Sequence, residues 1–285
     1  MYVKSIKSSL INGVRVDTLE VRFPRIILPE FNTHRVFSRN AQSSRAKPIS
    51  KVIQEDLTYN IRDYGWRKNN KGMSPVEFFD EIDSNELDER REAYKQATIE
   101  YVRYMEEKGV HKELANRPLE QFMETTVSVT ATEWKNFITL RSDSGAQLEI
   151  RVPTIEIKKV LSKTTPIERN FHLPYIEESL DNEYKYSSFF TKEMLIKKIK
   201  QSTARCARVS YFSFDKKESE LEKDIELFTK LKESKHLSPF EHVVLSNETL
   251  NFLFSMNDWQ GNSFNGNFSK GVIQFRKLIE LGIEV

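Results

Sequence analysis

Hydrophobic and charged positions alternate over the first two dozen residues of the chain. Between residues 2 and 23, apolar and β-branched residues such as Val14, Val16 and Val21 are separated by charged or polar ones. A period of two is typical of β-strands that bury one face. The pattern therefore predicts two strands, joined by a turn at Ile11-Asn12-Gly13.

A long helix is predicted in the next third of the chain. Ser74-Pro75-Val76-Glu77 combines an N-cap residue, a proline suited to the first helical position and a glutamate that can close a capping box. A helical stretch follows from about Glu86 to Lys108. Gly109 is a residue that commonly ends a helix.

Three more segments complete the pattern. Residues 130–133 (Thr-Ala-Thr-Glu) form a second capping box, which predicts a helix, and residues 216–233 predict an amphipathic one. Residues 257–271 are rich in glycine and asparagine and predict a loop, after which Ser269 is expected to cap a short last helix. The residues at helical spacing are Trp134, Phe137, Ile138 and Arg141 in the first helix and Leu221, Ile225, Phe228 and Leu231 in the second.

The composition is that of an ordinary globular chain. Its 285 residues are 38% hydrophobic and 30% charged, and no repeat, low-complexity tract or clear linker divides them. We therefore expect a single α+β domain over residues 1–285, in which a mixed or antiparallel sheet is flanked by helices.

Charge and cysteine content narrow the classes of function. Lys plus Arg number 44 against 42 Asp plus Glu, a balance that does not favour a general polyanion binder. One cysteine, Cys206, rules out an intramolecular disulfide framework and suits a reducing compartment. The N-terminal residues contain no apolar run long enough for a signal peptide or a membrane helix. We expect a soluble cytoplasmic protein with neither a nucleic-acid nor a membrane partner.

The densest polar cluster spans residues 33–45 and follows the apolar segment 23–31. Arg35 and Arg45 can each bind a phosphate or a carboxylate through two hydrogen bonds. Further hydrogen bonds to a sugar or a base edge are available from Ser38, Asn40 and Ser43. The same residue types are common at a capped helix start, so composition alone leaves both interpretations open.

Other motifs that carry chemistry are missing from the sequence. It contains no P-loop and no G-x-G-x-x-G after a predicted strand, so neither an NTPase nor a dinucleotide-binding βαβ unit is indicated. Its five histidines and one cysteine show no zinc-ligand spacing, so no metal site is predicted.

Three stretches resemble the motifs of flavin-dependent thymidylate synthases. Thr33-His34-Arg35, seven residues and then Ser43 is similar to the Arg-His-Arg, seven residues, Ser signature of that family. Residues 136–151, NFITLRSDSGAQLEIR, resemble its Asn-Phe-Leu-x-Leu-Arg-x-Asp-x-x-Ala-Gln-x-Glu-Ile segment. Residues 207–210, ARVS, and 236–242, HLSPFEH, resemble its Ala-Arg-x-Ser and His-x-Ser/Thr-Pro-Phe-Glu-His elements.

The order of these motifs differs from that of typical members. Those members carry the Ala-Arg-x-Ser and Ser-Pro-Phe-Glu-His elements first, whereas here they lie in residues 204–245. They follow both the signature region, residues 13–45, and a nucleotide and flavin region, residues 113–151. A circular permutation would leave this pattern, and permutation is tolerated where the termini lie close together at the surface.

The resemblance implies a flavin-dependent reaction on a pyrimidine nucleotide. The enzyme would be a homotetramer with sites between subunits, each binding FAD, dUMP and a folate. Reduced flavin would carry a methylene from methylenetetrahydrofolate to C5 of dUMP and return a hydride, with NADPH reducing the flavin. No cysteine nucleophile is needed, so Cys206 is expected to be a small buried residue.

The resemblance also assigns residues to ligands. Arg141 would bind the uracil and, as the catalytic residue, stabilise negative charge that develops on the ring when C5 becomes nucleophilic. The family's dUMP positions fall on Ser43, Ser44, Arg45, Arg117 and Arg141. Its FAD positions fall on His34, Arg35, Asn40, Asn136, His236 and Ser238. We expect Ser43, Arg141 and Ser238 to converge on one pocket, either within one chain or from different subunits.

Several positions depart from the family pattern. Thr33 stands for the first Arg of the signature, Ala41 for a Glu, Glu30 for a Gln, Thr130 and Thr132 for an Asn and an Arg that hold FAD, and Gly145 for a His. The loss of two arginines near phosphates would weaken FAD binding, unless another arginine substitutes. The candidates are Arg25, Arg39 and Arg151.

Three other interpretations remain open from the sequence. A related flavin- or folate-dependent enzyme that delivers hydroxymethyl to the nucleotide would use the same residues, and a paralogue that has lost activity would explain the departures. A non-catalytic nucleic-acid-binding protein is suggested by the basic run 192–200 and the basic, aromatic loop 66–71. Leu195, Ile196 and Ile199 nevertheless give the run an apolar stripe, as expected for a helix that packs on a core.

Overall fold

The computed structural model describes residues 1–72, 75–177, 179–180, 184, 187, 190–211, 221–255 and 264–283. The backbone of Ser210 and Tyr211 is described without their side chains. Ser74 of the first predicted capping box lies outside these ranges, as do residues 216–220 of the predicted helix 216–233 and residues 257–263 of the predicted loop.

The predicted strand pair is confirmed and belongs to a five-stranded mixed sheet. β1 (Tyr2–Ile11) and β2 (Val14–Pro24) form an antiparallel hairpin, and its turn places both Asn12 and Gly13 at positive φ. The strand order is β3-β4-β2-β1-β5, with β3 (Ser38–Ala41) and β4 (Glu124–Ala131) antiparallel to their neighbours. β5 (Ile167–Glu168) pairs in parallel with β1.

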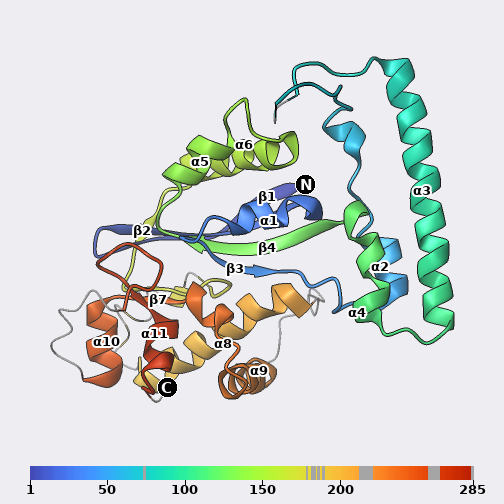
Figure 1. Ribbon diagram of the computed structural model, residues 1–285. Coiled ribbons are helices and arrows are strands. Elements are labelled where there is room, and N and C mark those ends of the chain that lie inside the picture. The colour runs from blue at the N-terminus through green and yellow to red at the C-terminus, as the bar shows by residue number, and fades with distance from the viewer. Residues whose placement is uncertain are drawn as a thin grey trace.

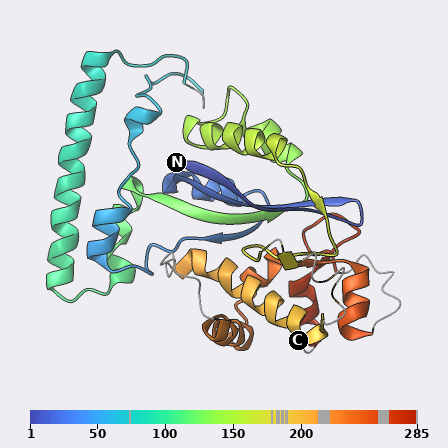
Figure 2. The ribbon, with the colours of Figure 1, turned by 180° about the vertical axis from the view of Figure 1, so that it is seen from behind.

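Helices cover both faces of this sheet, as Figures 1 and 2 show. On one face lie α5 (Lys135–Arg141) and α6 (Leu148–Lys163), and β2, β4 and these two helices enclose an apolar core. On the other face lie α8 (Lys192–Tyr211), α9 (Leu221–Glu233), α10 (Asn247–Phe254) and α11 (Phe275–Glu280).

The second helical layer has its own small sheet and its own core. β6 (Phe171–His172), β7 (Val244–Leu245) and β8 (Ile273–Gln274) are antiparallel. The short 3₁₀ helix η4 (Ser238–His242) packs between β3, α8 and α11. Residues 236–242, which resemble the family's His-x-Ser/Thr-Pro-Phe-Glu-His element, therefore pack against β3, which carries part of the signature 33–43.

A separate helical group lies beyond the ends of the strands, on the side where β3 ends and β4 begins (Figure 1). It consists of α2 (Ile49–Glu55), η2 (Ile61–Asp63), α3 (Glu81–Glu107), α4 (Lys112–Ala115) and η3 (Arg117–Phe122). The link from β2 to this end begins with η1 (Arg25–Ile27) and α1 (Leu28–Asn32). The predicted end of the long helix is confirmed, because Lys108 is its C-cap and Gly109 has a φ of 74°.

Local helix signals gave three wrong boundaries. The long helix begins at Glu81, where Asp80 Oδ1 accepts from Asp83 N at 2.9 Å, and not at Pro75. Thr130 lies inside β4, and α5 starts after Trp134 with no side-chain cap. A cap competes with the strand ladder for the same backbone, and here the eight-residue ladder with β2 prevails.

Ser269 is the third case. Its backbone N and its Oγ both donate to Thr132 Oγ1, at 2.8 and 3.0 Å, and the last helix starts six residues later at Phe275. Residues 264–271, the described part of the predicted loop, contain neither helix nor strand. The suggestion that residues 33–45 are simply a helix start is also wrong, since residues 38–41 form β3.

Candidate active site

Arg141, the predicted catalytic residue, is held by a histidine of the signature. Its Nε donates to His34 Nε2 at 3.0 Å, and this bond joins the end of α5 to the segment between α1 and β3. The His34 ring packs edge-to-face on Phe137 at 4.8 Å between centroids and is tilted on Phe37 at 5.8 Å. Phe137 precedes Arg141 by four residues, so the helix presents both side chains to His34.

The departure at Thr33 becomes intelligible next to this pair. Arg141 Nη2 donates weakly to Thr33 Oγ1 at 3.3 Å and to the Glu30 carbonyl at 3.5 Å. Thr33 Oγ1 in turn donates to the Glu30 carbonyl at 2.7 Å. At position 33 this chain therefore presents Arg141 with a short hydroxyl acceptor.

His34 is neutral in this setting. Burial lowers its pKa below the usual 6.5, and the positive charges of Arg141 and Arg39 lower it further. Arg39 Nη1 also donates to the His34 carbonyl at 2.7 Å, so the second guanidinium is fixed there. Because Nε2 accepts from Arg141, the ring carries its proton on Nδ1.

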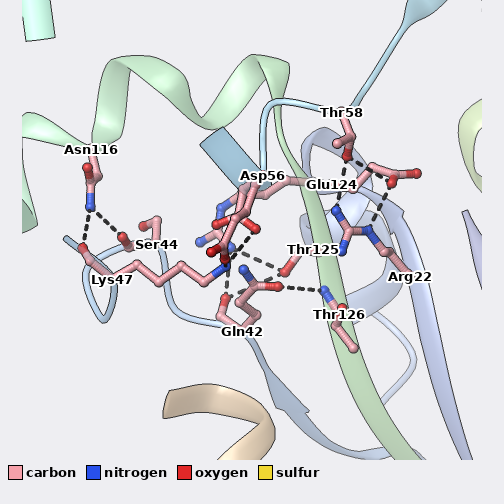
Figure 3. A network of polar contacts seen from close by, with 12 residues as sticks. Arg22, Gln42, Ser44, Lys47, Asp56, Thr58, Asn116, Glu124, Thr125 and Thr126 are labelled. Carbon is pink, nitrogen blue, oxygen red and sulfur yellow. Dashed lines mark hydrogen bonds and ion pairs between the residues drawn. The ribbon is translucent and has the colours of Figure 1, made fainter. Parts of the chain in front are cut away.

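The loop after β3, which holds the predicted nucleotide residues, is fastened by a buried polar network (Figure 3). Asn116 Nδ2 donates to the Ser44 and Lys47 carbonyls at 2.8 and 3.1 Å, and Lys47 Nζ pairs with Asp56 at 2.9 Å. The Gln42 side chain accepts from Thr126 N at 3.2 Å. This network sets the path of residues 42–47, leaving Ser43 half-buried and Arg45 exposed.

Glu120 gathers two of the predicted dUMP residues. Its Oε1 accepts from Ser44 Oγ at 2.5 Å, from Arg117 Nη1 at 2.9 Å and from Arg25 Nη2 at 3.2 Å. Arg25 and Arg117 line a cleft of about 420 Å³ together with Glu120 and residues of α1, Leu28 and Pro29. Sequence reasoning did not single out Glu120, because a Glu three residues after an Arg is also typical of an ordinary surface ion pair.

A chain of fully buried side chains connects the sheet to the second helical layer. Ser9 Oγ lies 2.8 Å from His172 Nδ1, and His172 Nε2 lies 2.7 Å from Thr18 Oγ1. Thr18 Oγ1 lies 2.5 Å from Thr130 Oγ1, which lies 2.8 Å from His242 Nδ1. Burial lowers the pKa of His242 to about 3, and that of His172 also lies well below its ordinary value, so both imidazoles are neutral.

The predicted flavin residues divide into two sets. Arg35 and Asn136 are exposed, and a guanidinium and an amide are donors that suit a pyrophosphate and an adenine ring. His236 is exposed just before η4, and Ser238 is half-buried at its start. All four positions are accessible at the surface of the chain.

Asn40, also predicted to bind the flavin, differs from these four in its burial. It is buried in β3, and its Nδ2 donates to the Cys206 carbonyl at 3.4 Å. Thr130 is likewise enclosed, between Thr18 and His242. Thr132 is more open and borders a cleft of about 570 Å³ that Trp134 and Lys135 also line.

The predicted convergence of Ser43, Arg141 and Ser238 is not achieved by direct contact. Within the ranges that the structure describes, no hydrogen bond or ion pair joins any two of them. The elements of Arg141 and Ser238 lie on opposite faces of the sheet, with edge strand β3 between them (Figures 1 and 2). A single site that contains Ser43, Arg141 and Ser238 therefore requires either a ligand that extends across the β3 edge of the sheet or residues from a second copy of the chain.

Neither a metal cluster nor a membrane-crossing helix is found in the part of the chain that the structure describes. Among the described residues, no group of three or more His, Cys, Asp or Glu side chains is placed to hold a metal ion. Within the same residues, no helix has both the length and the apolar character that a membrane crossing requires.

Comparison with known proteins gives a family. A search of curated proteins returns no match. Among solved structures, the chain is similar to a UMP/dUMP methylase, PolB from Streptomyces cacaoi, bound with 5-Br UMP, at a TM-score of 0.45 and 15% identity over 57% of this chain and 88% of that one. A second structure of PolB, bound with 5-Br dUMP, gives a TM-score of 0.43 and 16% identity over 52% and 67%.

The family model of the thymidylate synthase complementing proteins matches residues 9–167. This range is more than half of the chain and contains His34, Arg117 and Arg141. The fold agrees with the expectation drawn from the motifs, a mixed sheet flanked by helices. The chain belongs to the thymidylate synthase complementing protein family.

Proposed function

We propose that this chain methylates dUMP at C5 to give dTMP. Methylenetetrahydrofolate is the carbon donor in this proposal, and FAD reduced by NADPH supplies the reducing equivalents. Family membership supports the reaction class, and the geometry around Arg141 is the observation that carries the proposal.

Arg141 suits recognition of a pyrimidine. Its Nε is bound to His34, and in the described part of the chain its Nη1 has no hydrogen-bond partner. A half-buried guanidinium with one open edge can offer hydrogen bonds to a carbonyl of the uracil. Fixed positive charge at that position stabilises the anionic ring that forms as C5 attacks the carbon donor.

The cleft with two arginines suits the phosphate of the same nucleotide. Arg25 and Arg117 present two guanidiniums, and Ser44 reaches the same Glu120 carboxylate. Leu28 and Pro29 of α1 line this cleft, whereas the Glu30 carbonyl, farther along α1, contacts Arg141. The phosphate cleft and the base-binding arginine therefore contact neighbouring residues of one short helix.

The only cysteine cannot serve as a nucleophile in its present surroundings. Cys206 is fully buried in α8, and burial raises the pKa of its thiol far above the physiological range. A thiolate is the reactive form of cysteine, so attack on C6 of the pyrimidine by a thiolate is disfavoured. This supports a route that does not depend on a covalent link to the protein.

FAD is the cofactor in this proposal. Arg35, Asn136 and Ser238 would hold it, with His236 beside the ring system, and it would supply the hydride chemistry that the amino acids lack. Because these residues lie on two faces of the sheet, we also propose a homotetramer in which neighbouring chains complete each site.

Product analysis tests this function directly. Purified protein is incubated with FAD, NADPH, methylenetetrahydrofolate and dUMP, and the nucleotide is identified by mass spectrometry. A gain of one methyl group is expected, a hydroxymethyl product would redirect the proposal to the related modification, and unchanged dUMP would contradict it. Arg117→Ala should raise KM for dUMP by about tenfold or more with little change in kcat, because it removes binding to a phosphate that does not react.

The basic run that suggested nucleic-acid binding has a structural explanation. Residues 192–200 lie in α8, where Leu195 and Ile199 are fully buried in the core of the second layer. Lys192 and Lys197 are exposed, Lys198 and Lys200 are half-buried, and Lys200 Nζ lies 5.5 Å from the centre of the Phe228 ring in α9.

A further inference from the structure

His34 makes a contact that binding to a cofactor does not require. Its Nε2 is the acceptor for Arg141 Nε at 3.0 Å, and only 8% of the surface of His34 is exposed. Phe37 and Phe137 confine the ring from two sides. The imidazole therefore cannot turn without breaking this packing, and the direction of its Nε2 lone pair is fixed.

We propose that His34 is a positioning residue that aims the Arg141 guanidinium at the pyrimidine, and that it does so only as the neutral Nδ1–H imidazole. This inference rests on the proposed function, because the pyrimidine is the ligand that Arg141 is expected to meet. An arginine side chain has many rotamers, and a single fixed acceptor at Nε orients its planar fork. Nη2 contacts Thr33 and the Glu30 carbonyl, and the Nη1 N–H groups then point at the ligand at little further entropic cost.

Protonation reverses the contact. A protonated His34 would carry N–H at both ring nitrogens, so Nε2 would face the Arg141 N–H as a donor and as a second positive charge. The charged groups packed around the ring are Arg141 from α5 and Arg39 from β3, and both disfavour protonation. Two other charged residues lie in the same segment of the chain as His34. Glu30 contacts Arg141 through its backbone carbonyl, and Arg35 is exposed.

The sign of the pH dependence follows from the lowered pKa. His34 is neutral at pH 7 and gains its proton only when the pH falls below the usual histidine value of 6.5. The affinity for dUMP through Arg141 is therefore complete at neutral pH and is lost progressively at lower pH. The nucleotide phosphate also titrates, with a second pKa near 6, so a protein variant must serve as the reference.

The test compares His34→Gln with His34→Phe. Gln keeps a carbonyl acceptor for Arg141 Nε but does not titrate, whereas Phe fills the aromatic cage without an acceptor. At pH 7.5, calorimetric titration with dUMP should give His34→Gln an affinity within about threefold of wild type. His34→Phe should bind about 10–100-fold more weakly, the range expected for a hydrogen bond to a charged group. His111→Phe, at an exposed position, is the matched control and should bind as wild type.

The pH profile separates positioning from simple packing. Between pH 7.5 and 5, wild type should lose more affinity than His34→Gln, since phosphate protonation affects both proteins equally. Parallel profiles, or full affinity in a folded His34→Phe protein, would overturn the proposal. If His34→Phe does not fold, the comparison of wild type with His34→Gln still decides.

An experiment without nucleotide distinguishes this proposal from the function on which it rests. In ligand-free protein, ¹⁵N NMR of the histidine ring should show the Nδ1–H tautomer, and Arg141→Ala should shift the Nε2 resonance. The other tautomer, or an Nε2 resonance that does not respond, would show that His34 does not hold Arg141. Absence of dUMP binding by wild type at every pH, with the expected NMR result, would contradict the proposed substrate alone.

Discussion

At the scale of single residues, Arg141 is the side chain on which the proposed chemistry depends most. Removing a donor that stabilises charge at a reacting centre costs ~10²–10³ in rate, so Arg141→Ala should lower kcat by that order. Arg141→Lys keeps the charge but loses the planar fork and the Nε contact with His34, so it should also fall well short of wild type. Steady-state turnover of dUMP measures both.

The competing explanation for Arg141 is a stabilising charge at the end of α5. A cation near a helix C-terminus contributes ~0.3–1 kcal/mol to stability and leaves the chemistry alone. Melting temperatures recorded with the rates separate the two roles, and Arg103→Ala, at an exposed arginine of α3, is the matched control. Near-normal turnover in both Arg141 variants would assign the residue to the scaffold.

Cys206 gives the opposite expectation. Its thiol is buried in α8 with a raised pKa, and its carbonyl, not its sulfur, contacts Asn40. Cys206→Ala should therefore keep most of the activity, at a packing cost of ~1 kcal/mol in the free energy of unfolding. Urea unfolding and turnover check this together. A fall of kcat by several orders of magnitude in a folded variant would point to a cysteine nucleophile.

At the scale of elements, His242 fastens η4 to the sheet. Its Nδ1 lies 2.8 Å from Thr130 Oγ1 in β4, and Thr130 continues to Thr18 in β2. η4 also carries Ser238, one of the proposed flavin residues. A helix of five residues forms few hydrogen bonds of its own, so the position of η4 depends on side-chain contacts to neighbouring elements.

The buried neutral state of His242 predicts an acid-sensitive fold. Its pKa is about 3 when folded, against 6.5 for an ordinary histidine, so between these values only the unfolded chain binds the proton. The free energy of unfolding should therefore fall as the pH drops below 6.5, by up to about 1.4 kcal/mol per pH unit from this residue. Urea unfolding from pH 7.5 to 4.5 measures the slope.

His242→Gln provides the reference for that slope. The variant keeps polar atoms near Thr130 but cannot titrate, so its stability should decline less steeply below pH 6.5. It will be less stable than wild type at pH 7.5, where packing is disturbed and no proton is involved. Identical slopes for the two proteins would show that His242 is not held neutral by burial.

At the scale of the whole molecule, the proposed site residues lie on two faces of one sheet. Arg141 belongs to the layer of α5, and Ser238 belongs to the layer of α8 and α11, with β3 at the edge between them (Figure 2). If neighbouring chains complete each site, two inactive variants can restore one another. Arg141→Ala mixed with Ser238→Ala, after dissociation and reassembly, should regain up to about a quarter of wild-type turnover at tetramer sites that draw one residue from each of two chains.

Two measurements bound that prediction. Analytical ultracentrifugation should show a tetramer for wild type and for both variants, so that failure to assemble is not mistaken for failure to complement. Mixing Arg141→Ala with Ser238→Ala without the dissociation step serves as the control for subunit exchange. A monomer that turns over dUMP, or tetramers that never complement, would indicate that the ligand passes round the β3 edge of a single chain.

Features that depend on residues close together in the chain could be predicted from the sequence. Alternation fixed the β1–β2 hairpin with its Asn12-Gly13 turn, and helical spacing fixed the long helix up to Gly109. Motif spacing pointed to the family and to Arg141, because residues that act on one ligand keep their order within a segment. The permuted arrangement of the domain stays a prediction, although η4 and β3, which carry parts of two motifs, pack together.

The tertiary structure decided what depends on residues far apart in the chain. Thr130 could cap a helix, but pairing with β2 made it part of a strand, since eight ladder positions outweigh one cap. His34 lies 107 positions from Arg141, and Glu120 lies 76 from Ser44, so no local pattern could show that they meet. Burial also cannot be read from residue type, and it is burial that leaves Asn40 facing the α8 backbone while Arg35 stays open to a ligand.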